Sequence, residues 1–441
     1  MAANPKTITL EEIQIHRLDE ARRNTDALFK ILQADSFYER PIPERHRIIF
    51  YLGHLEAFDW NLFRGQNLSL DPFAPELDKL FAFGIDPVGG GLPTEAPEAW
   101  PAIETVVEYD RRIREEIDAA LRKERFAERA TGASTETLCH VAVEHRLMHA
   151  ETLAYMFHQL PLKRKIRQAQ RNVSGAFSAN EMVEIPAGKS TLGLRRSDPS
   201  LFGWDNEFGG FEVEVPAFQI EKYMVSNGEF LTFLEAGGYY DPLLWSAADW
   251  AWKESRHVQH PAFWRRDEEE WVYRGMFEEM MLPLEWPVYA SHAEASAYAR
   301  WAGKALPTEA QWHRAAYGAP AGRERDFPWG TEEPNSRLGN FDFSRWDPAP
   351  VDAFPANTSA WGVVGQLGNG WEWTSSQFAP FDGFEAFPFY PGYSADFFDG
   401  KHYVMKGGSP RTAAPLLRRS FRNWFQPHYQ YAYAGFRCVS R

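Results

Sequence analysis

Apolar residues return at helical spacing through the first third of the chain. Between residues 10 and about 162 they recur every three or four positions, as in the runs Ile48, Tyr51, Leu52, Leu55, Phe58, Leu62 and Ile103, Val107, Ile113, Ile117. Residues with this spacing share one face of an α-helix, and that face can be buried against a neighbour. The pattern predicts a bundle of long amphipathic helices, interrupted by a loop of Gly and Pro at 87–93.

The pattern changes after residue 162. The polar and basic stretch 162–172 predicts a linker, and short apolar runs separated by Gly and Pro follow it. Only two segments of this region, 226–236 and 292–302, show convincing helical periodicity. We therefore expect two domains, residues 1–170 and 175–441, the second of them rich in loops and short strands.

Composition and charge narrow the range of functions. With 44% hydrophobic and 24% charged residues, the 441-residue chain resembles an ordinary globular protein with a large core. A net charge of −14 disfavours nucleic acid as a partner, because such binding relies on Lys and Arg. The sequence contains neither an apolar run of the roughly 20 residues that span a bilayer nor a signal-peptide pattern. We therefore expect a cytoplasmic protein that does not bind membranes.

Three histidines stand out in the helical region. His145 and His149 are one helical turn apart, and His54 lies in an earlier helical segment beside Phe50 and Phe58. Side chains four positions apart project from one face of a helix, so two imidazoles can bind one metal ion. A buried imidazole without a partner costs about 1–3 kcal/mol, and coordination removes that cost. The three histidines are therefore the candidate ligands of a metal site in the bundle core.

The ligand set alone leaves the metal open. Three neutral histidines without a thiolate suit zinc, iron or copper. A three-His zinc hydrolase would use zinc-bound water as its nucleophile. Three imidazoles on one face of an octahedral iron would leave three adjacent positions for oxygen and two organic ligands. The spacing of the histidines does not decide between these two hypotheses.

Several segments of the second region resemble a known family. Residues 218–230, 303–312, 368–374, 406–409 and 434–438 are similar to the signature segments of the formylglycine-generating-enzyme fold, a variant of the C-type-lectin fold. Preceded by a DinB-type four-helix bundle with three histidines, this region resembles the ergothioneine sulfoxide synthases and their ovothiol- and selenoneine-synthase relatives over nearly the whole chain. The resemblance implies an α+β protein whose second domain caps an active site in the bundle.

The resemblance also implies an activity. Members of this family are iron(II) enzymes that use O2 to join a sulfur or selenium donor to imidazole C2 of hercynine, so Fe(II) is the expected cofactor. Tyr390 and Tyr393 match the family's pair of tyrosines, and Tyr390 is the expected catalytic residue, as a proton or electron donor. Asn423 and Trp424 match the contacts to the betaine substrate, whose trimethylammonium group Trp can cover by cation–π attraction.

Departures from the family pattern bear on the chalcogen donor. Met148 stands before the last histidine, where actinobacterial ergothioneine synthases have Gln, and Phe425 follows the Asn-Trp pair, where they have Asp. No paired arginines for the donor's carboxylates are found near 81–86. A pocket without these charges would leave the charged groups of γ-glutamylcysteine unpaired. We therefore place Met148, Phe425 and Tyr393 among the substrate-binding residues and expect a neutral selenosugar as the donor.

The branch of the family follows from similar comparisons. The contexts of 49–54 and 83–87 look closer to the ovothiol and selenoneine synthases than to the actinobacterial enzymes. Ovothiol synthases commonly continue into a methyltransferase domain, whereas this chain stops at Arg441. A selenoneine synthase is the first expectation. The alternative is an ergothioneine sulfoxide synthase that uses cysteine or γ-glutamylcysteine, and an arginine such as Arg411 or Arg418 in the pocket wall would favour it.

Hypotheses of other classes stay open. The three-His zinc hydrolase is one of them. A formylglycine-generating activity would need two redox-capable cysteines in the second domain, which has Cys438 alone, while Cys139 lies in the bundle. A non-enzymatic, lectin-like sugar-binding module would leave the three histidines without a purpose. It predicts that His149→Ala does not alter ligand binding.

Overall fold

The structure, a computed structural model, describes residues 9–66, 68, 70–82, 99–123, 133–170, 173–175, 179–196 and 202–440. Clustering of its contacts separates two units, Met1–Gln168 and Ala169–Arg441. The predicted Gly-Pro loop at 87–93 and the segment 83–87 lie outside the described residues.

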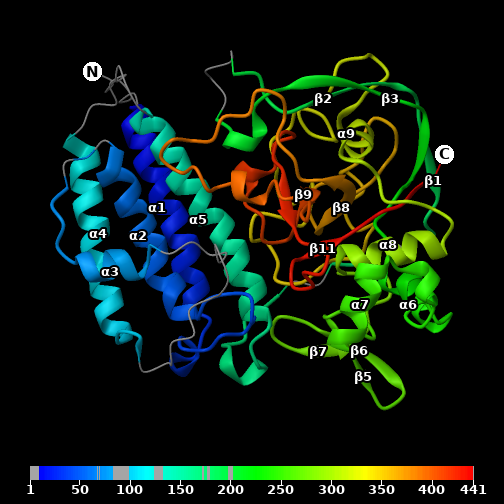
Figure 1. Ribbon diagram of the computed structural model, residues 1–441, viewed down its shortest axis with the longest axis horizontal. Helices are drawn as coiled ribbons and strands as arrows, with labels where there is room; N and C mark the ends of the chain where they lie inside the picture. Colours follow the sequence, from blue (N-terminus) through cyan, green and yellow to red (C-terminus); the bar gives the residue numbers. More distant parts are fainter. Residues whose placement is uncertain are drawn as a thin grey trace, which may run out of the picture. The chain divides into compact units, whose positions relative to one another are not determined.

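The described part of the first unit contains four long helices and one short helix (Figure 1). They are α1 Leu10–Phe29, α2 Ile48–Gln66, α3 Pro75–Leu80, α4 Ile103–Lys123 and α5 Thr135–His158, with single 3-10 turns η1 Ala34–Ser36 and η3 Leu162–Arg164. Helix α1 packs along α5, and α2 packs against both α4 and α5. The predicted helical bundle is confirmed.

Side-chain caps explain where two of these helices begin. The Thr9 hydroxyl accepts a hydrogen bond from the N–H of Glu12, whose carboxylate accepts one from the N–H of Thr9. This capping box satisfies N–H groups that the first turn of α1 leaves unpaired. The Ser134 hydroxyl caps α5 by accepting from the N–H of Thr137.

Burial follows the predicted apolar face of α4 except at one position. Ile113 and Ile117 are fully buried, but Val107 is 51% exposed. Val106 and Tyr109 face the core instead. The expectation for Val107 was wrong because the 3.6-residue repeat brings the preceding residue to the inward position.

The first part of the predicted linker belongs to the bundle. The N–H of Gln33 donates to the carbonyl of Arg164 at 3.0 Å, which ties η3 to the end of α1. Gln170 instead accepts a hydrogen bond from the N–H of Trp346, in the second unit. Residue 170 is therefore anchored in the second unit.

Short strands form four small sheets in the described part of the second unit (Figure 1). Their orders are β1-β4-β12, β10-β9-β8-β11, β2-β3 and β5-β6-β7. The strands are β1 Met182–Ile185, β2 Gly188–Leu192, β3 Phe211–Val215, β4 Phe218–Glu221, β5 Trp264–Asp267, β6 Glu270–Arg274, β7 Glu279–Met281, β8 Gly370–Gln377, β9 Tyr403–Gly408, β10 Asn423–Phe425, β11 Ala434–Gly435 and β12 Val439–Ser440. With the helices of both units, they confirm the α+β class.

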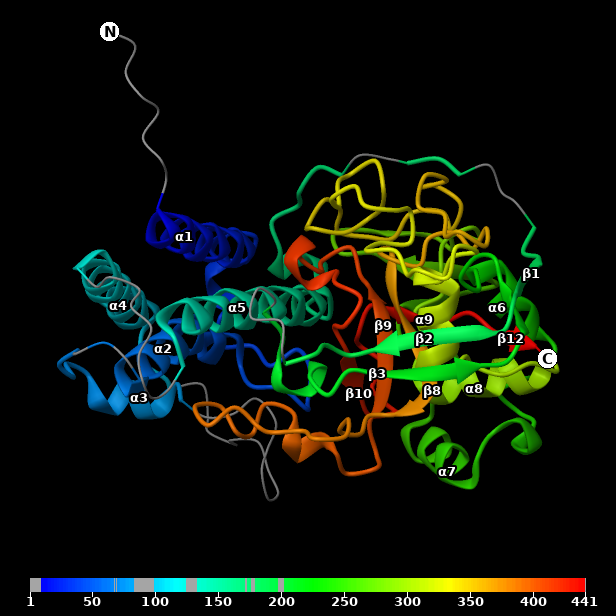
Figure 2. The same cartoon turned by 90° about the horizontal axis from the view of Figure 1, so that it is seen from above.

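Four helices accompany these sheets in the described residues, two more than predicted. They are α6 Asn227–Glu235, α7 Ala247–Arg256, α8 His292–Trp301 and α9 Glu309–Tyr317. Helix α9 packs between the β2-β3 pair and the β8-β9 sheet (Figure 2). The prediction missed α9, which is nine residues long and largely buried. The capping box of Thr308 and Gln311 was the available signal.

None of the described helices is both long enough and apolar enough to cross a bilayer.

A buried ion pair and one tryptophan bring three of the signature segments together. Arg437 and Glu372 are fully buried and form two hydrogen bonds of 2.7 Å. Trp312 Nε1 donates to the same carboxylate at 2.7 Å. These residues come from the end of the chain, from β8 and from α9, so the segments 303–312, 368–374 and 434–438 meet in one core contact.

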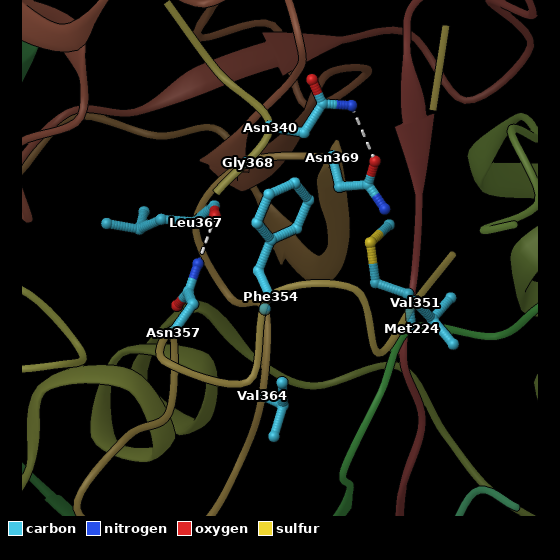
Figure 3. A pocket seen from close by; sticks show the side chains of 10 residues that line it. Met224, Asn340, Val351, Phe354, Asn357, Val364, Leu367, Gly368 and Asn369 are labelled. Atoms are coloured by element: carbon cyan, nitrogen blue, oxygen red, sulfur yellow. Dashed lines mark hydrogen bonds between the residues drawn. The ribbon is translucent and has the colours of Figure 1, made fainter. Parts of the chain in front are cut away.

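A small cavity lies beside the 368–374 segment (Figure 3). It measures about 10 Å³, and its lining includes Asn340, Phe354, Asn357 and Asn369. Asn369 adopts a left-handed φ of 68°, and its side chain is hydrogen-bonded to Asn340. A space of this size holds about one water molecule and no substrate.

Candidate metal centre

The three predicted histidines meet inside the bundle. His54 comes from α2, and His145 and His149 come from successive turns of α5. All three are buried, and one ring nitrogen of each lies within 4.8 Å of those of the others. The Nε2 atoms of His145 and His149 are 3.1 Å apart. Two metal–nitrogen bonds of about 2.1 Å at right angles place their nitrogen atoms about 3 Å apart, so this separation suits a shared ion.

The hydrogen bond of His54 leaves its second nitrogen for a metal. Nδ1 lies 2.7 Å from the carbonyl of Phe81, which only accepts, so Nδ1 carries the proton. Nε2 is then a lone-pair donor, and it is buried with no hydrogen-bond partner among the described residues. A carbonyl partner that fixes the tautomer in this way is typical of metal-binding histidines. The donor set therefore fits a divalent transition metal.

Burial keeps the three rings neutral. It lowers the pKa of His54 to about 4 and the pKa values of His145 and His149 well below their usual 6.5. The neighbouring histidines and the guanidinium of Arg146 act in the same direction. A metal ligand must be unprotonated, so the protein environment already favours the binding form.

Aromatic rings hold the imidazoles in place. Phe58 stacks on His145 with ring centroids 3.4 Å apart, and Phe50 stacks on His54 at 4.9 Å. Each phenylalanine is four residues from His54 on α2, so one helix supplies both the ligand and the rings that pack around it. Met148, the predicted substrate contact before His149, is half-buried on α5.

The second unit brings together three of its predicted site residues. Tyr393 stacks on Trp204 at 4.0 Å, and Tyr390 lies 5.5 Å from Tyr393, measured between ring centroids. Trp424 meets the ring of Tyr393 edge-on at 5.5 Å and stacks on Phe378 at 4.1 Å. Tyr390, Tyr393 and Trp424 therefore belong to one aromatic cluster, although 31 residues separate the last two along the chain.

Asn423 and Phe425 lie on the other face of β10. Successive residues of a strand point to opposite faces, so Trp424 projects away from both. The carboxamide oxygen of Asn423 accepts from the N–H of Trp424 at 2.8 Å. Phe425 stacks on Tyr429 at 4.7 Å. Asn423 and Trp424 are thus sequence neighbours with different surroundings.

The two arginines that would favour an amino-acid donor are both engaged internally. Arg418 forms a charge-assisted pair with the buried carboxylate of Glu207. Arg411 donates to the carbonyl of Phe343 at 3.1 Å and lies 3.9 Å above the ring of Trp346. Each guanidinium therefore already has a partner within the second unit.

Sequence reasoning missed the residues around the histidines. Phe81 acts through its backbone carbonyl, which no side-chain pattern reveals. Glu56 and Arg146, close in sequence to His54 and His145, are fully buried against each other. Their position among apolar residues of α2 and α5 was the one available signal.

Comparison with known proteins agrees with this organisation. Residues 168–441 match the family described as the sulfatase-modifying factor enzyme 1-like domain, and residues 17–153 match the DinB superfamily. The hercynine oxygenase of Mycobacterium tuberculosis is 41% identical over 235 residues, which cover 53% of this chain and 55% of that protein. Ergothioneine biosynthesis protein 1 of Neurospora crassa is 29% identical and covers 93% of this chain and 55% of that protein.

The chain also resembles a formylglycine-generating enzyme. The formylglycine-generating enzyme of Mycobacterium tuberculosis is 29% identical over 246 residues, covering 45% of this chain and 75% of that protein. The chain spans little more than half the length of the hercynine oxygenase that it matches. Because the match at 168–441 covers more than half of the sequence, the chain belongs to the sulfatase-modifying factor enzyme 1-like domain family, with a DinB-superfamily bundle preceding that domain.

Proposed function

We propose that this chain is an iron(II)- and O2-dependent enzyme that joins a selenium or sulfur donor to imidazole C2 of hercynine, the trimethylated betaine of histidine. The observation that carries the proposal is the convergence of His54, His145 and His149 in a buried bundle. Relatives named hercynine oxygenase and ergothioneine biosynthesis protein 1 support hercynine and O2 as substrates.

The proposed reaction balances in atoms and electrons. The C2–H bond of the imidazole and the chalcogen–H bond of the donor break, and a carbon–chalcogen bond forms. O2 accepts four electrons, so that one oxygen atom ends on the chalcogen and the other leaves as water. Iron(II) would supply the one-electron chemistry that O2 requires and hold the reactants close together.

Residues of the second unit would bind hercynine and move a proton. Trp424 would cover the trimethylammonium group with the indole face that does not stack on Phe378. The hydroxyl of Tyr390 would donate the proton taken up by the reduced oxygen. Asn423 is left out of this arrangement, because it lies on the opposite face of β10 from Trp424. Tyr393, beside Tyr390, would hold that ring in place.

We place a neutral selenosugar first as the donor, and a thiol, either cysteine or γ-glutamylcysteine, second. Met148 and Phe425 are apolar at positions where charged or hydrogen-bonding contacts would recognise γ-glutamylcysteine. The internal pairing of Arg411 and Arg418 supports the same choice, because a carboxylate would have to displace their present partners.

The decisive experiment first identifies the metal in the protein as purified and then identifies the product of the iron-loaded protein. Purified protein is loaded anaerobically with Fe(II), then given O2, hercynine and equal amounts of a selenosugar, cysteine and γ-glutamylcysteine. We expect oxygen consumption and a C2-substituted product by mass spectrometry, with the selenosugar adduct in excess. His149→Ala abolishes both, and His140→Ala, on the same helix but bonded to Gln14, serves as the control.

Other results would contradict the proposal. Zinc as the bound metal together with activity in the absence of O2 would identify a hydrolase. Hercynine binding that His149→Ala leaves unchanged, with no product from any donor, would identify a binding module. A formylglycine-generating reaction is disfavoured by the chemistry of Cys438, because burial raises the pKa of this thiol well above its usual value.

A further inference from the structure

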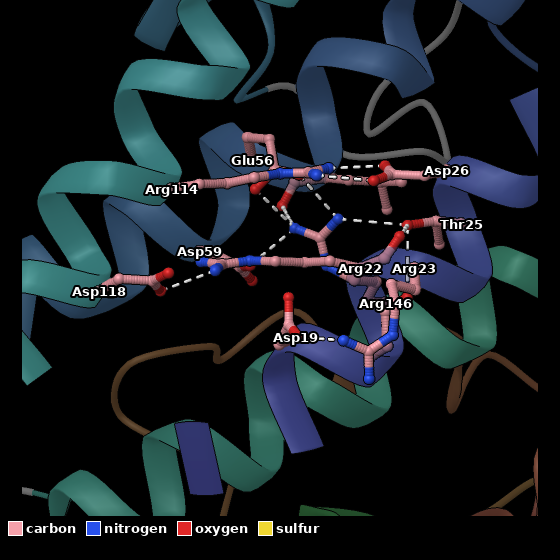
Figure 4. Close-up of polar contacts among 12 residues, drawn as sticks. Asp19, Arg22, Arg23, Thr25, Asp26, Glu56, Asp59, Arg114, Asp118 and Arg146 are labelled. Atoms are coloured by element: carbon pink, nitrogen blue, oxygen red, sulfur yellow. Dashed lines mark hydrogen bonds and ion pairs between the residues drawn. The ribbon is translucent and has the colours of Figure 1, made fainter. Parts of the chain in front are cut away.

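A network of buried charges joins helices of the bundle (Figure 4). Arg146 is fully buried and donates to both carboxylate oxygens of Glu56, at 2.9 and 2.8 Å. It also donates to Asp59 at 2.7 Å and to the carbonyl of Leu55 at 3.0 Å. Arg114, on α4, shares the carboxylate of Glu56 at 2.6 Å. One guanidinium on α5 is therefore held by three residues of α2, Leu55, Glu56 and Asp59.

The network adjoins the candidate ligands on both helices. Glu56 is two residues after His54, and Arg146 directly follows His145. The bidentate pair joins α2 to α5, since two parallel hydrogen bonds restrict how the guanidinium and the carboxylate can be oriented. A slip of one residue along a helix axis is about 1.5 Å, enough to break both hydrogen bonds and to carry His54 away from its partners.

We infer that Arg146 and Glu56 are positioning residues for the metal centre: their pair sets the register of α2 and α5 and so brings His54 to the nitrogen atoms of His145 and His149. The inference rests on the proposed metal site. Well-packed apolar side chains can often replace a buried ion pair without loss of stability, so folding alone does not require these contacts. A positioning role accounts for the location of Glu56 and Arg146 next to the candidate ligands.

The test measures metal binding to the whole chain rather than turnover. The metal-free protein is titrated anaerobically with Co(II), and the d–d absorption of Co(II) reports both affinity and coordination geometry. Glu56→Gln keeps the shape of the side chain but removes its charge. The matched control is Asp118→Asn, which breaks another arginine pair in the bundle, with Arg22 at 2.7 Å, joining α1 to α4 instead of α2 to α5.

We expect Glu56→Gln and Arg146→Lys to weaken Co(II) binding by about 10- to 100-fold and to change the absorption spectrum. Asp118→Asn should leave the Co(II) affinity within about threefold of the wild type, since Asp118 contacts neither the candidate ligands nor the pair that joins α2 to α5. If Glu56→Gln lowers the melting temperature but binds Co(II) as the wild type does, the pair only stabilises the fold and the inference is wrong.

A further variant keeps the test valid if the single variants fail to fold. The triple variant Arg146→Met, Glu56→Met, Asp59→Leu replaces the network by apolar side chains, which can restore stability. Weakened Co(II) binding in this folded variant supports the inference, whereas wild-type binding overturns it. If the wild-type chain binds Co(II) no more tightly than His149→Ala, the metal site itself is wrong, and this failure is separate from that of the positioning role.

Discussion

Gly53 and Phe81 control the orientation of a single candidate ligand. A Cβ atom at position 53 would lie 2.5 Å from the ring of Phe81, closer than real contacts allow. The carbonyl of Phe81 in turn accepts the hydrogen bond of His54 Nδ1. A hydrogen at position 53 therefore lets the end of α3 approach α2 closely enough to bind the imidazole.

Gly53→Ala tests this arrangement. In an exposed helix the change would stabilise by about 1 kcal/mol, but here we expect weaker metal binding, because the Phe81 ring and its carbonyl must move away from His54. The measurement is the dissociation constant for Co(II). Gly65→Ala is the control, since no described atom lies within 4 Å of the added methyl group. Equal Co(II) affinity in the two variants would contradict the argument.

Trp424 gives a prediction about substrate choice. Replacing it by Leu removes the cation–π contact, worth about 0.5–2 kcal/mol, and should raise the KM for hercynine by about 2- to 30-fold. Histidine, which lacks the trimethylammonium group, should show a much smaller change when assayed as an alternative substrate. Trp301→Leu, at a more exposed position on α8, is the control. The same loss for both substrates would mean that Trp424 acts only through packing.

At the level of the element, α8 depends on a buried histidine at its first turn. His292 stacks on Tyr403 of β9 at 3.8 Å, and its Nε2 lies 3.2 Å from the carbonyl of Thr374 in β8. Burial lowers its pKa to about 4, with Asp249 and the Thr374 carbonyl acting in the opposite direction. The neutral ring thus joins α8 to the central sheet.

This burial makes the second unit sensitive to acid. Below pH 6.5 the unfolded chain takes up a proton at His292 and the folded chain does not. The free energy of unfolding is therefore unaffected by this residue above pH 6.5 and decreases as the pH falls towards 4. The loss from this residue is about 3 kcal/mol. Urea titrations at pH 7 and pH 4.5 should show a smaller loss for His292→Gln than for the wild type. His257→Gln, at an exposed helix end, should match the wild type.

Capping residues mark the first turns of the helices in the second unit, including the two that the sequence prediction missed. Segment 292–302 shows apolar periodicity, and its capping box of Ser291 and Glu294 marks the first turn. Helix α7 follows a Ser246 cap and is mostly exposed, and α9 follows the Thr308 capping box and is buried on most of its surface.

At the scale of the whole molecule, metal binding should stabilise one unit selectively. With free metal at 1,000 times its dissociation constant, binding adds about 4 kcal/mol to the free energy of unfolding. Hydrogen exchange should then slow in α2 and α5, which carry the ligands, and chelation should reverse the effect. The amides of β8 and β9 are the internal control. Slower exchange in β8 and β9 alone would place the metal elsewhere.

Sequence alone determined the helical bundle, the loop-rich second unit and which three histidines are the candidate metal ligands. These features follow from local spacing and local motifs. Tertiary structure decided that His54 faces the pair on α5, that the carbonyl of Phe81 sets its tautomer and that Arg146 binds Glu56. Each of these contacts joins residues at least 27 positions apart. Their proximity depends on how the helices pack, and side-chain periodicity does not encode it.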